Sequence, residues 1–336
     1  MANSDPKTIR FHGKTEPVLE TFRVRGRRYF VLEKLSRRGA FRVFDPHAGP
    51  HGDYRTLYKL SNSKTTRQSI EVLRRLGGPS SNRNFPGIVD FVRQNDDLFV
   101  VVAWVAGTDL RRYLEAVRGN RTPRPSVSEV VRLARGLVHG RAHYHRRTNI
   151  VHGDVSPANL ILTSGPTQLI LVDFGSAWPM ERTATKVDGD GITEPYAAPE
   201  RVTDHAAEDF RSDAFSVAVV AYELLTLAIP YGGLGGRAGT PSLVNKMGDA
   251  YEQPSKLIHR NKLPRRATKL LDECCAVGLA LAPDDRFATT SDWIAAWDKL
   301  HFAMKKGSQL NRFESFVADR IAAICAAFQS KSDKSS

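Results

Sequence analysis

Two short stretches give the clearest view of this chain, HGDVSPANLIL at residues 152–162 and LILVDFG at residues 169–175. Each sets one carboxylate, Asp154 or Asp173, beside an apolar run that is typical of a buried strand. Asn159 lies five residues after the first carboxylate and directly before its apolar run. Because loops on rigid strands hold polar groups in fixed geometry, the two stretches predict one site with three oxygen-bearing side chains.

This set of side chains suits the transfer of a phosphoryl group. Such a transfer needs a carboxylate to orient the attacking hydroxyl, and oxygen ligands to hold Mg²⁺ on the phosphates of a nucleotide. One Asp or Asn alone is explained as the cap of a turn, whereas three in register favour a catalytic site. At these residues the chain resembles the eukaryotic-like protein kinases: HGD (152–154) with Asn159 resembles their catalytic loop, and DFG (173–175) their magnesium-binding loop.

The resemblance implies ATP as the phosphoryl donor, with Mg²⁺ or Mn²⁺ as the metal ion. Asp154 would orient a serine or threonine hydroxyl of a protein or peptide substrate, and Asn159 and Asp173 would hold the metal. Because aminoglycoside and choline kinases also carry HGD in this loop, a small-molecule kinase is an alternative. The stretch TEPYAAPE (193–200) favours a protein substrate, because it resembles a segment that those small-molecule kinases lack.

The rest of the chain divides into a strand-rich and a helix-rich part. Residues 28–105 carry strand patterns around one helical stretch, and residues 106–300 are mainly helical in pattern. This order predicts an α+β fold with two lobes, an antiparallel sheet plus one helix and then a helical lobe, as the resemblance also implies. We expect residues 1–27 to form a basic N-terminal extension or an added edge segment, and residues 301–336 a further helix with a solvated tail.

The resemblance implies a nucleotide site in the first lobe. Lys59 matches the lysine that contacts the nucleotide phosphates, and Glu71, the only acid between Lys59 and Asp90, is its expected partner. The alternative for Glu71 is a residue on the helix surface beside Arg74 and Arg75. Backbone groups and an apolar slot would hold the adenine ring. The residues expected to contact the nucleotide are Leu35, Gly39, Val43, Leu57, Lys59, Val102, Ala103, Trp104, Val105 and Ile161.

Three further residues match structural positions of the family. Glu200, in APE (198–200), needs a buried cationic partner to offset its desolvation, and Arg286 matches the family's arginine. Asp213 matches a carboxylate at a helix start that accepts backbone hydrogen bonds from the catalytic loop. We therefore expect the apolar segment that follows Asp213 to be a central buried helix.

The chain also departs from the family pattern. The stretch LSRRGAFRV (35–43) keeps one glycine where the family uses several to bring backbone over the phosphates. Arg37, Arg38 or Arg42 is the expected substitute donor to phosphate. Gly153 stands where many members have an arginine that receives a phosphorylated segment, which predicts no switching by that route. Ser156 replaces a lysine that neutralises the transferred group, which predicts slow turnover. These departures keep a pseudokinase, or nucleotide-binding scaffold, as an alternative.

Composition narrows the setting in which the protein works. The 336 residues are 41% hydrophobic, enough for one large or two modest cores, and carry a net charge of +13. The three cysteines lack metal or disulfide spacing, and MANSDPKTIRFHGK lacks the apolar core of a signal peptide, so we expect a cytoplasmic location. Glu223, within the most apolar stretch, argues against a transmembrane segment. The charge is compatible with nucleic acid or anionic lipid as a partner, but no binding motif accompanies it.

Overall fold

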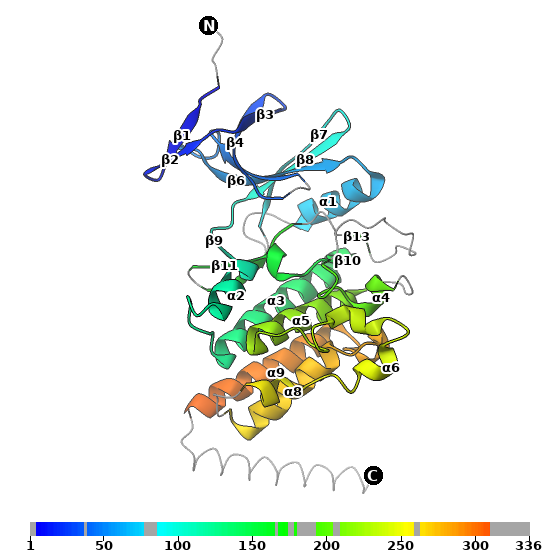
Figure 1. Ribbon diagram of the computed structural model, residues 1–336. Coiled ribbons are helices and arrows are strands. Elements are labelled where there is room, and N and C mark those ends of the chain that lie inside the picture. The colour runs from blue at the N-terminus through cyan, green and yellow to red at the C-terminus, as the bar shows by residue number, and fades with distance from the viewer. Residues whose placement is uncertain are drawn as a thin grey trace, which may run out of the picture.

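The computed structural model has two lobes, a sheet with one helix in the N-terminal part and a set of packed helices in the C-terminal part (Figure 1). The described residues are 5–36, 39–76, 86–164, 167–173, 178–179, 193–203, 209–258 and 263–309. The two-lobed α+β arrangement predicted from the sequence is confirmed.

Six antiparallel strands form the sheet of the N-terminal lobe, in the order β3-β4-β5-β6-β8-β7. The strands are rich in β-branched and aromatic residues, which suit a pleated surface. Helix α1 (Lys64–Leu76) packs against one side of the sheet. The strands are β3 (Glu20–Val24), β4 (Arg27–Lys34), β5 (Ala40–Asp45), β6 (Asp53–Ser61), β7 (Ile88–Gln94) and β8 (Asp97–Ala103).

The two faces of this sheet bury different side chains, because successive residues of a strand point to opposite sides. The inner face, toward α1, carries Tyr58 of β6 beside Val100 and Val102 of β8, and Ile70 of α1 packs in the same cluster. The outer face carries a second apolar cluster that includes Leu57 of β6. Since both faces bury apolar side chains, hydrophobic pattern alone does not tell the two faces apart.

The described residues before β4, from residue 5 onward, belong to the N-terminal lobe. A hairpin of β1 (Thr8–Phe11) and β2 (Lys14–Pro17) packs near β5, where the rings of Phe11 and Phe44 meet edge to face with centroids 5.2 Å apart. Strand β3 then pairs with β4 and forms one edge of the six-stranded sheet. Within this region, β3 is therefore an edge strand of the six-stranded sheet, while β1 and β2 form a separate two-stranded sheet.

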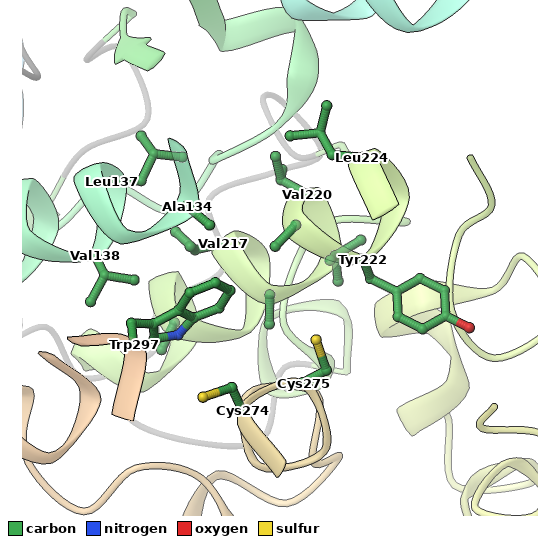
Figure 2. Close-up of a cluster of buried hydrophobic side chains, with 14 of the residues drawn as sticks. Ala134, Leu137, Val138, Val217, Val220, Tyr222, Leu224, Cys274, Cys275 and Trp297 are labelled. Atoms are coloured by element: carbon green, nitrogen blue, oxygen red, sulfur yellow. The ribbon is translucent and has the colours of Figure 1, made fainter. Parts of the chain in front are cut away.

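The C-terminal lobe is built around α5 (Phe210–Thr226), in which every residue from Ser212 to Leu225 is buried. This confirms the central buried helix expected after Asp213. Figure 2 shows α5 side chains such as Val217 and Val220 packed between α3, α8 and α9, beside the buried thiols of Cys274 and Cys275. The other helices are α2 (Leu110–Arg118), α3 (Val127–Thr148), α4 (Pro199–Val202), α6 (Val244–Met247), α7 (Pro254–Leu257), α8 (Arg265–Gly278) and α9 (Thr290–Gln309).

Short strands and turns lie where the two lobes meet. Three of them form a small antiparallel sheet in the order β12-β11-β9, and β10 pairs with β13. The short elements at this junction are β9 (Gly107–Asp109), β10 (Ile150–Val151), β11 (Leu160–Thr163), β12 (Leu169–Leu171), β13 (Trp178–Pro179) and the 3₁₀ turn η1 (Pro157–Asn159). The 3₁₀ turns η2 (Gly235–Gly239) and η3 (Pro283–Asp285) belong to the helical lobe.

Two helix boundaries bear on the predicted organisation. Ser126 caps α3 through a reciprocal capping box with Glu129. Helix α9 runs on to Gln309, so the expected boundary at residue 300 falls inside a helix. The further helix expected in the last segment lies beyond residue 309, outside the described residues.

Within the described part of the chain, no helix combines the length and the apolar character needed to cross a bilayer.

Candidate active site

The strand pair β11–β12 brings Asn159 and Asp173 to the same end of a small sheet. Leu160 pairs with Leu171 in antiparallel register, and the N–H of Val172 donates to the carbonyl oxygen of Asn159 over 2.8 Å. Asn159 directly precedes β11, and Asp173 lies two residues after the end of β12. The tight hairpin register therefore makes these two residues neighbours although they are far apart in the chain.

The carboxylate of Asp154 is held on both oxygens. Its Oδ2 accepts a hydrogen bond of 2.8 Å from Asn159 Nδ2, which also donates to the Asp154 carbonyl over 2.9 Å. Its Oδ1 accepts from the N–H and the hydroxyl of Thr193, over 3.1 and 2.9 Å. Asp154 is nearly buried, at 8% exposure, so these bonds leave it one orientation. The structure thus brings Asp154 and Asn159 into direct contact and places Asp173 beside Asn159 through the strand register, while the catalytic roles of the three stay a prediction.

The donor set fits a magnesium ion. The Nδ2 of Asn159 is used on Asp154, which leaves Oδ1 as the side-chain atom of Asn159 that is able to bind a cation. Asp173 adds a carboxylate at the adjacent strand end. Amide and carboxylate oxygens are the ligands that Mg²⁺ and Mn²⁺ prefer. These two residues are therefore suited to hold the metal ion of a nucleotide complex.

Asp213 anchors the loop that carries Asp154. Its carboxylate accepts the backbone N–H groups of His152 and Gly153, each over 3.0 Å, which confirms the predicted role. The Arg141 guanidinium and the Nε2 atom of His145, the latter 3.0 Å away, contact the same carboxylate from α3. Burial alone would raise the pKa of Asp213, but the Arg141 charge and the His145 hydrogen bond hold that pKa well below its ordinary value. Asp213 therefore stays ionised as an acceptor.

A second buried pair supports the segment that carries Thr193. Arg286 Nη1 and Nη2 each lie 2.8 Å from an oxygen of Glu200, and the Ser212 hydroxyl donates to the same carboxylate over 2.7 Å. The predicted pairing of Glu200 with Arg286 is confirmed. Both partners are buried, so the bidentate geometry and the added hydroxyl offset their desolvation.

The structure does not bring Lys59 to this site. Lys59 points to the outer face of the sheet, and its Nζ atom lies 2.9 Å from Asp97 Oδ2, with both side chains about two-fifths exposed. Helix α1 lies on the inner face, so the expected pair between Lys59 and Glu71 is not made. The inner-face position beside α1 belongs to Tyr58, whose hydroxyl accepts a 3.1 Å hydrogen bond from the N–H of Asp173. A strand alternates its side chains, so Tyr58 and Lys59 cannot both face inward.

Because of the same alternation, two residues that were expected to line the adenine slot lie on the other face of the sheet. Val43 and Leu57 are fully buried in the outer-face cluster, on the side away from α1. The inner face at this level carries Arg42 and Thr56, which pair with each other, and Thr56 pairs with Val102. Thr56 and Tyr58 were missed because the sequence motif was matched through the lysine, and no composition signal distinguishes the two faces. Arg42, one of the three arginines expected to contact phosphate, lies on the inner face beside Thr56.

Local backbone structure explains why residue 39 is a glycine. It has a φ of +85°, and a Cβ on it would meet the carbonyl oxygen of Lys59 at 2.5 Å. Its own carbonyl accepts the N–H of Lys59 over 2.8 Å. The glycine is thus needed for a close approach between β5 and β6, independent of any nucleotide. Leu35, 42% exposed, lies at the end of the same hairpin and its N–H donates to Ala40.

The remaining expected nucleotide contacts lie near the end of β8 and in β11. Ala103 uses its N–H on the carbonyl of Gly87 over 2.9 Å, so that donor is not free for a base. Trp104 and Val105 follow β8 and are half-buried, as is Ile161 of β11. A role of these groups in adenine binding stays a prediction. Phe174, Gly175, Arg37 and Arg38, which also entered the predicted site, lie outside the described residues.

Comparisons with known proteins fit this geometry. The family model described as "Protein kinase domain" matches residues 55–293. Serine/threonine-protein kinase PknD of Mycobacterium tuberculosis is 33% identical over 217 residues, 63% of this chain and 30% of PknD. Serine/threonine-protein kinase PknH of Mycobacterium bovis is 29% identical over 235 residues, 70% of this chain and 37% of PknH. The chain therefore spans about a third of the length of these curated relatives.

The fold has solved counterparts as well. The crystal structure of the Mycobacterium tuberculosis PknI kinase domain superposes with a TM-score of 0.53 at 24% sequence identity. The match covers 81% of this chain and 96% of that domain. The likeness supports the two-lobed fold described above.

Proposed function

This chain belongs to the protein kinase family, and we propose that it transfers the γ-phosphoryl group of ATP to serine or threonine hydroxyls of a protein substrate. The observation that carries the proposal is the Asp154 carboxylate, fixed by Asn159 and Thr193 on a loop that Asp213 anchors. The substrate type rests on the likeness to the serine/threonine-protein kinases. The buried cysteines Cys274 and Cys275, which are free thiols, are in keeping with a cytoplasmic setting.

In the proposed reaction, Asp154 orients the substrate hydroxyl and accepts its proton as the phosphoryl group departs from ATP. Asn159 and Asp173 would hold the metal ion, which when bound would neutralise charge on the phosphates. Thr193 and Asn159 hold the Asp154 carboxylate from opposite oxygens, so its direction is set before the substrate arrives. Because positioning accounts for much of the catalysis of phosphoryl transfer, this preorganisation is the chain's main contribution.

We further propose slow turnover without a switch at the catalytic loop. Ser156 is fully buried, and its Oγ lies 3.4 Å from the Thr193 hydroxyl, where a lysine would bring a positive charge. Gly153 has a φ of +76°, and its N–H is bonded to Asp213. A glycine offers no guanidinium to a phosphorylated segment. Both features favour a constitutive enzyme with modest transition-state stabilisation.

The first test is phosphoryl transfer itself. The purified chain is incubated with γ-labelled ATP, Mg²⁺ or Mn²⁺ and a generic basic protein. Asp154→Asn should lower the rate at least about a hundredfold, because the hydroxyl loses its oriented acceptor, while nucleotide binding persists. Asp249→Asn, a change at an exposed carboxylate, is the matched control and should keep the wild-type rate. Equal rates in Asp154→Asn and wild type would refute the role of Asp154.

A nucleotide-binding scaffold is the second candidate, because one observation favours it. Lys59 pairs with Asp97 on the outer face, so in this structure its ammonium does not reach the expected phosphate position. This candidate predicts metal-dependent binding of ATP with no incorporation of label into any substrate. The same assay separates the two functions when binding is measured alongside transfer.

A further inference from the structure

Strand β6 joins the expected metal loop through a tyrosine. The hydroxyl of Tyr58 accepts a 3.1 Å hydrogen bond from the N–H of Asp173. Tyr58 itself is buried, at 7% exposure, in the cluster that Ile70 of α1 and Val100 of β8 complete. The ring is therefore fixed from two sides before its hydroxyl meets Asp173.

Asp173 needs such support, because its backbone is unusual. Its φ is +67°, in the left-handed region that residues other than glycine adopt uncommonly. The preceding residue, Val172, is still tied to Asn159 by its N–H, so the chain turns at Asp173. The hydrogen bond to the Asp173 N–H stabilises this backbone conformation. The backbone conformation in turn sets the direction of the Asp173 carboxylate.

We propose that Tyr58 is a positioning residue for metal-dependent nucleotide binding: its hydroxyl holds Asp173 in the left-handed turn that directs the carboxylate toward the side of Asn159. The inference rests on the proposed nucleotide site, and it does not require that phosphoryl transfer occurs. It gives the inner face of β6 a part in nucleotide binding, whereas Lys59, the residue expected to contact the phosphates, lies on the opposite face. Tyr58 acts through Asp173 and is not placed in contact with the substrate.

The test compares Tyr58→Phe with the wild-type chain by calorimetric titration of ADP, with and without Mn²⁺. Loss of one buried hydrogen bond should weaken ADP binding in Mn²⁺ about fivefold, while metal-free ADP binding stays within about twofold. Tyr231→Phe is the matched control, because the Tyr231 hydroxyl donates to Leu279 over 2.7 Å inside the helical lobe. It removes an equally buried hydroxyl and should leave both affinities unchanged. Equal losses with and without Mn²⁺, or no loss in Tyr58→Phe, would overturn the inference.

A second measurement follows the contact without any ligand. In wild type the Asp173 amide should exchange slowly with deuterium, and Tyr58→Phe should speed exchange in a peptide covering residues 167–173 about fivefold. Unchanged exchange would refute the contact. If the wild-type chain binds ADP with Mn²⁺ but transfers no phosphate, the proposed kinase activity fails, and these two comparisons still decide the role of Tyr58.

Discussion

At the scale of single residues, the chain separates its proposed catalytic loop from the lysine expected to bind the nucleotide. Asp154 and Asn159 meet through direct hydrogen bonds, and Asp173 is the neighbour of Asn159 across a strand pair. Lys59 instead forms an exposed ion pair with Asp97. Exposed pairs of this kind contribute about 0–1 kcal/mol to stability. Which side of one strand faces inward thus decides whether a conspicuous lysine takes part in the chemistry.

The Lys59 placement leads to a sharp prediction. Lys59→Met should change kcat/KM for ATP by less than about threefold and lower the free energy of unfolding by no more than about 1 kcal/mol, since it removes only a surface pair. Asp97→Asn removes the same pair from the other side and should behave alike. A loss of transfer of about a hundredfold in Lys59→Met alone would place the lysine at the phosphates and contradict the structure.

At the scale of elements, the β1–β2 hairpin is tied to the sheet by one carboxylate. Glu16 Oε1 accepts the Tyr54 hydroxyl over 2.7 Å and lies 3.2 Å from Arg42 Nη1. Arg42 also pairs with Glu33 and lies over the ring of Trp104, 5.8 Å from its centroid. The Arg42 hydrogen bond lowers the pKa of Glu16, so the carboxylate is charged at neutral pH. The hairpin is therefore coupled to the inner face near the end of β8.

We expect Glu16→Gln to loosen this hairpin without unfolding the lobe. Loss of the charge from a partly buried pair should cost about 1 kcal/mol, or about fivefold in the local opening equilibrium. Hydrogen exchange of residues 8–17 measures that opening. Glu20→Gln, at the exposed start of β3, is the control and should leave exchange in the hairpin unchanged. Hairpin exchange that is the same in both variants and wild type would show that Glu16 does not hold the element.

At the scale of the whole molecule, buried ionisable groups make folding sensitive to acid. Burial, and then the Arg141 charge, lower the pKa of His152 to about 3, far below its ordinary 6.5. The unfolded chain takes up a proton on this histidine below about pH 6.5, and the folded chain does not until about pH 3. Stability therefore falls as the pH drops through that window. Glu200, whose pKa the Arg286 hydrogen bond lowers despite its burial, adds a loss at lower pH, because its stabilisation exists only above its unfolded pKa.

This reasoning predicts the pH dependence of unfolding. Between about pH 6 and pH 4, His152 should contribute a fall of up to about 1.4 kcal/mol per pH unit, measured by urea unfolding at each pH. His152→Gln removes the titrating ring and should flatten the profile by that amount. His51→Gln, at an exposed histidine, should leave the slope as in wild type. A slope that His152→Gln does not change would contradict the neutral buried ring.

The sequence by itself determined the two-lobed α+β fold, the Asp213 anchor and the partnership of Glu200 with Arg286, and it predicted the residues of the proposed catalytic loop. These features depend on short loops of fixed spacing and on charged residues that need a partner when buried, and both can be recognised in the sequence. Only the tertiary structure decided that Tyr58 faces Asp173 while Lys59 faces Asp97. A shift of one residue exchanges the two faces of a strand. Because the sheet is apolar on both sides, the hydrophobic pattern of β6 is compatible with either orientation. Packing against α1 and the neighbouring strands therefore decides which side chains of β6 face inward.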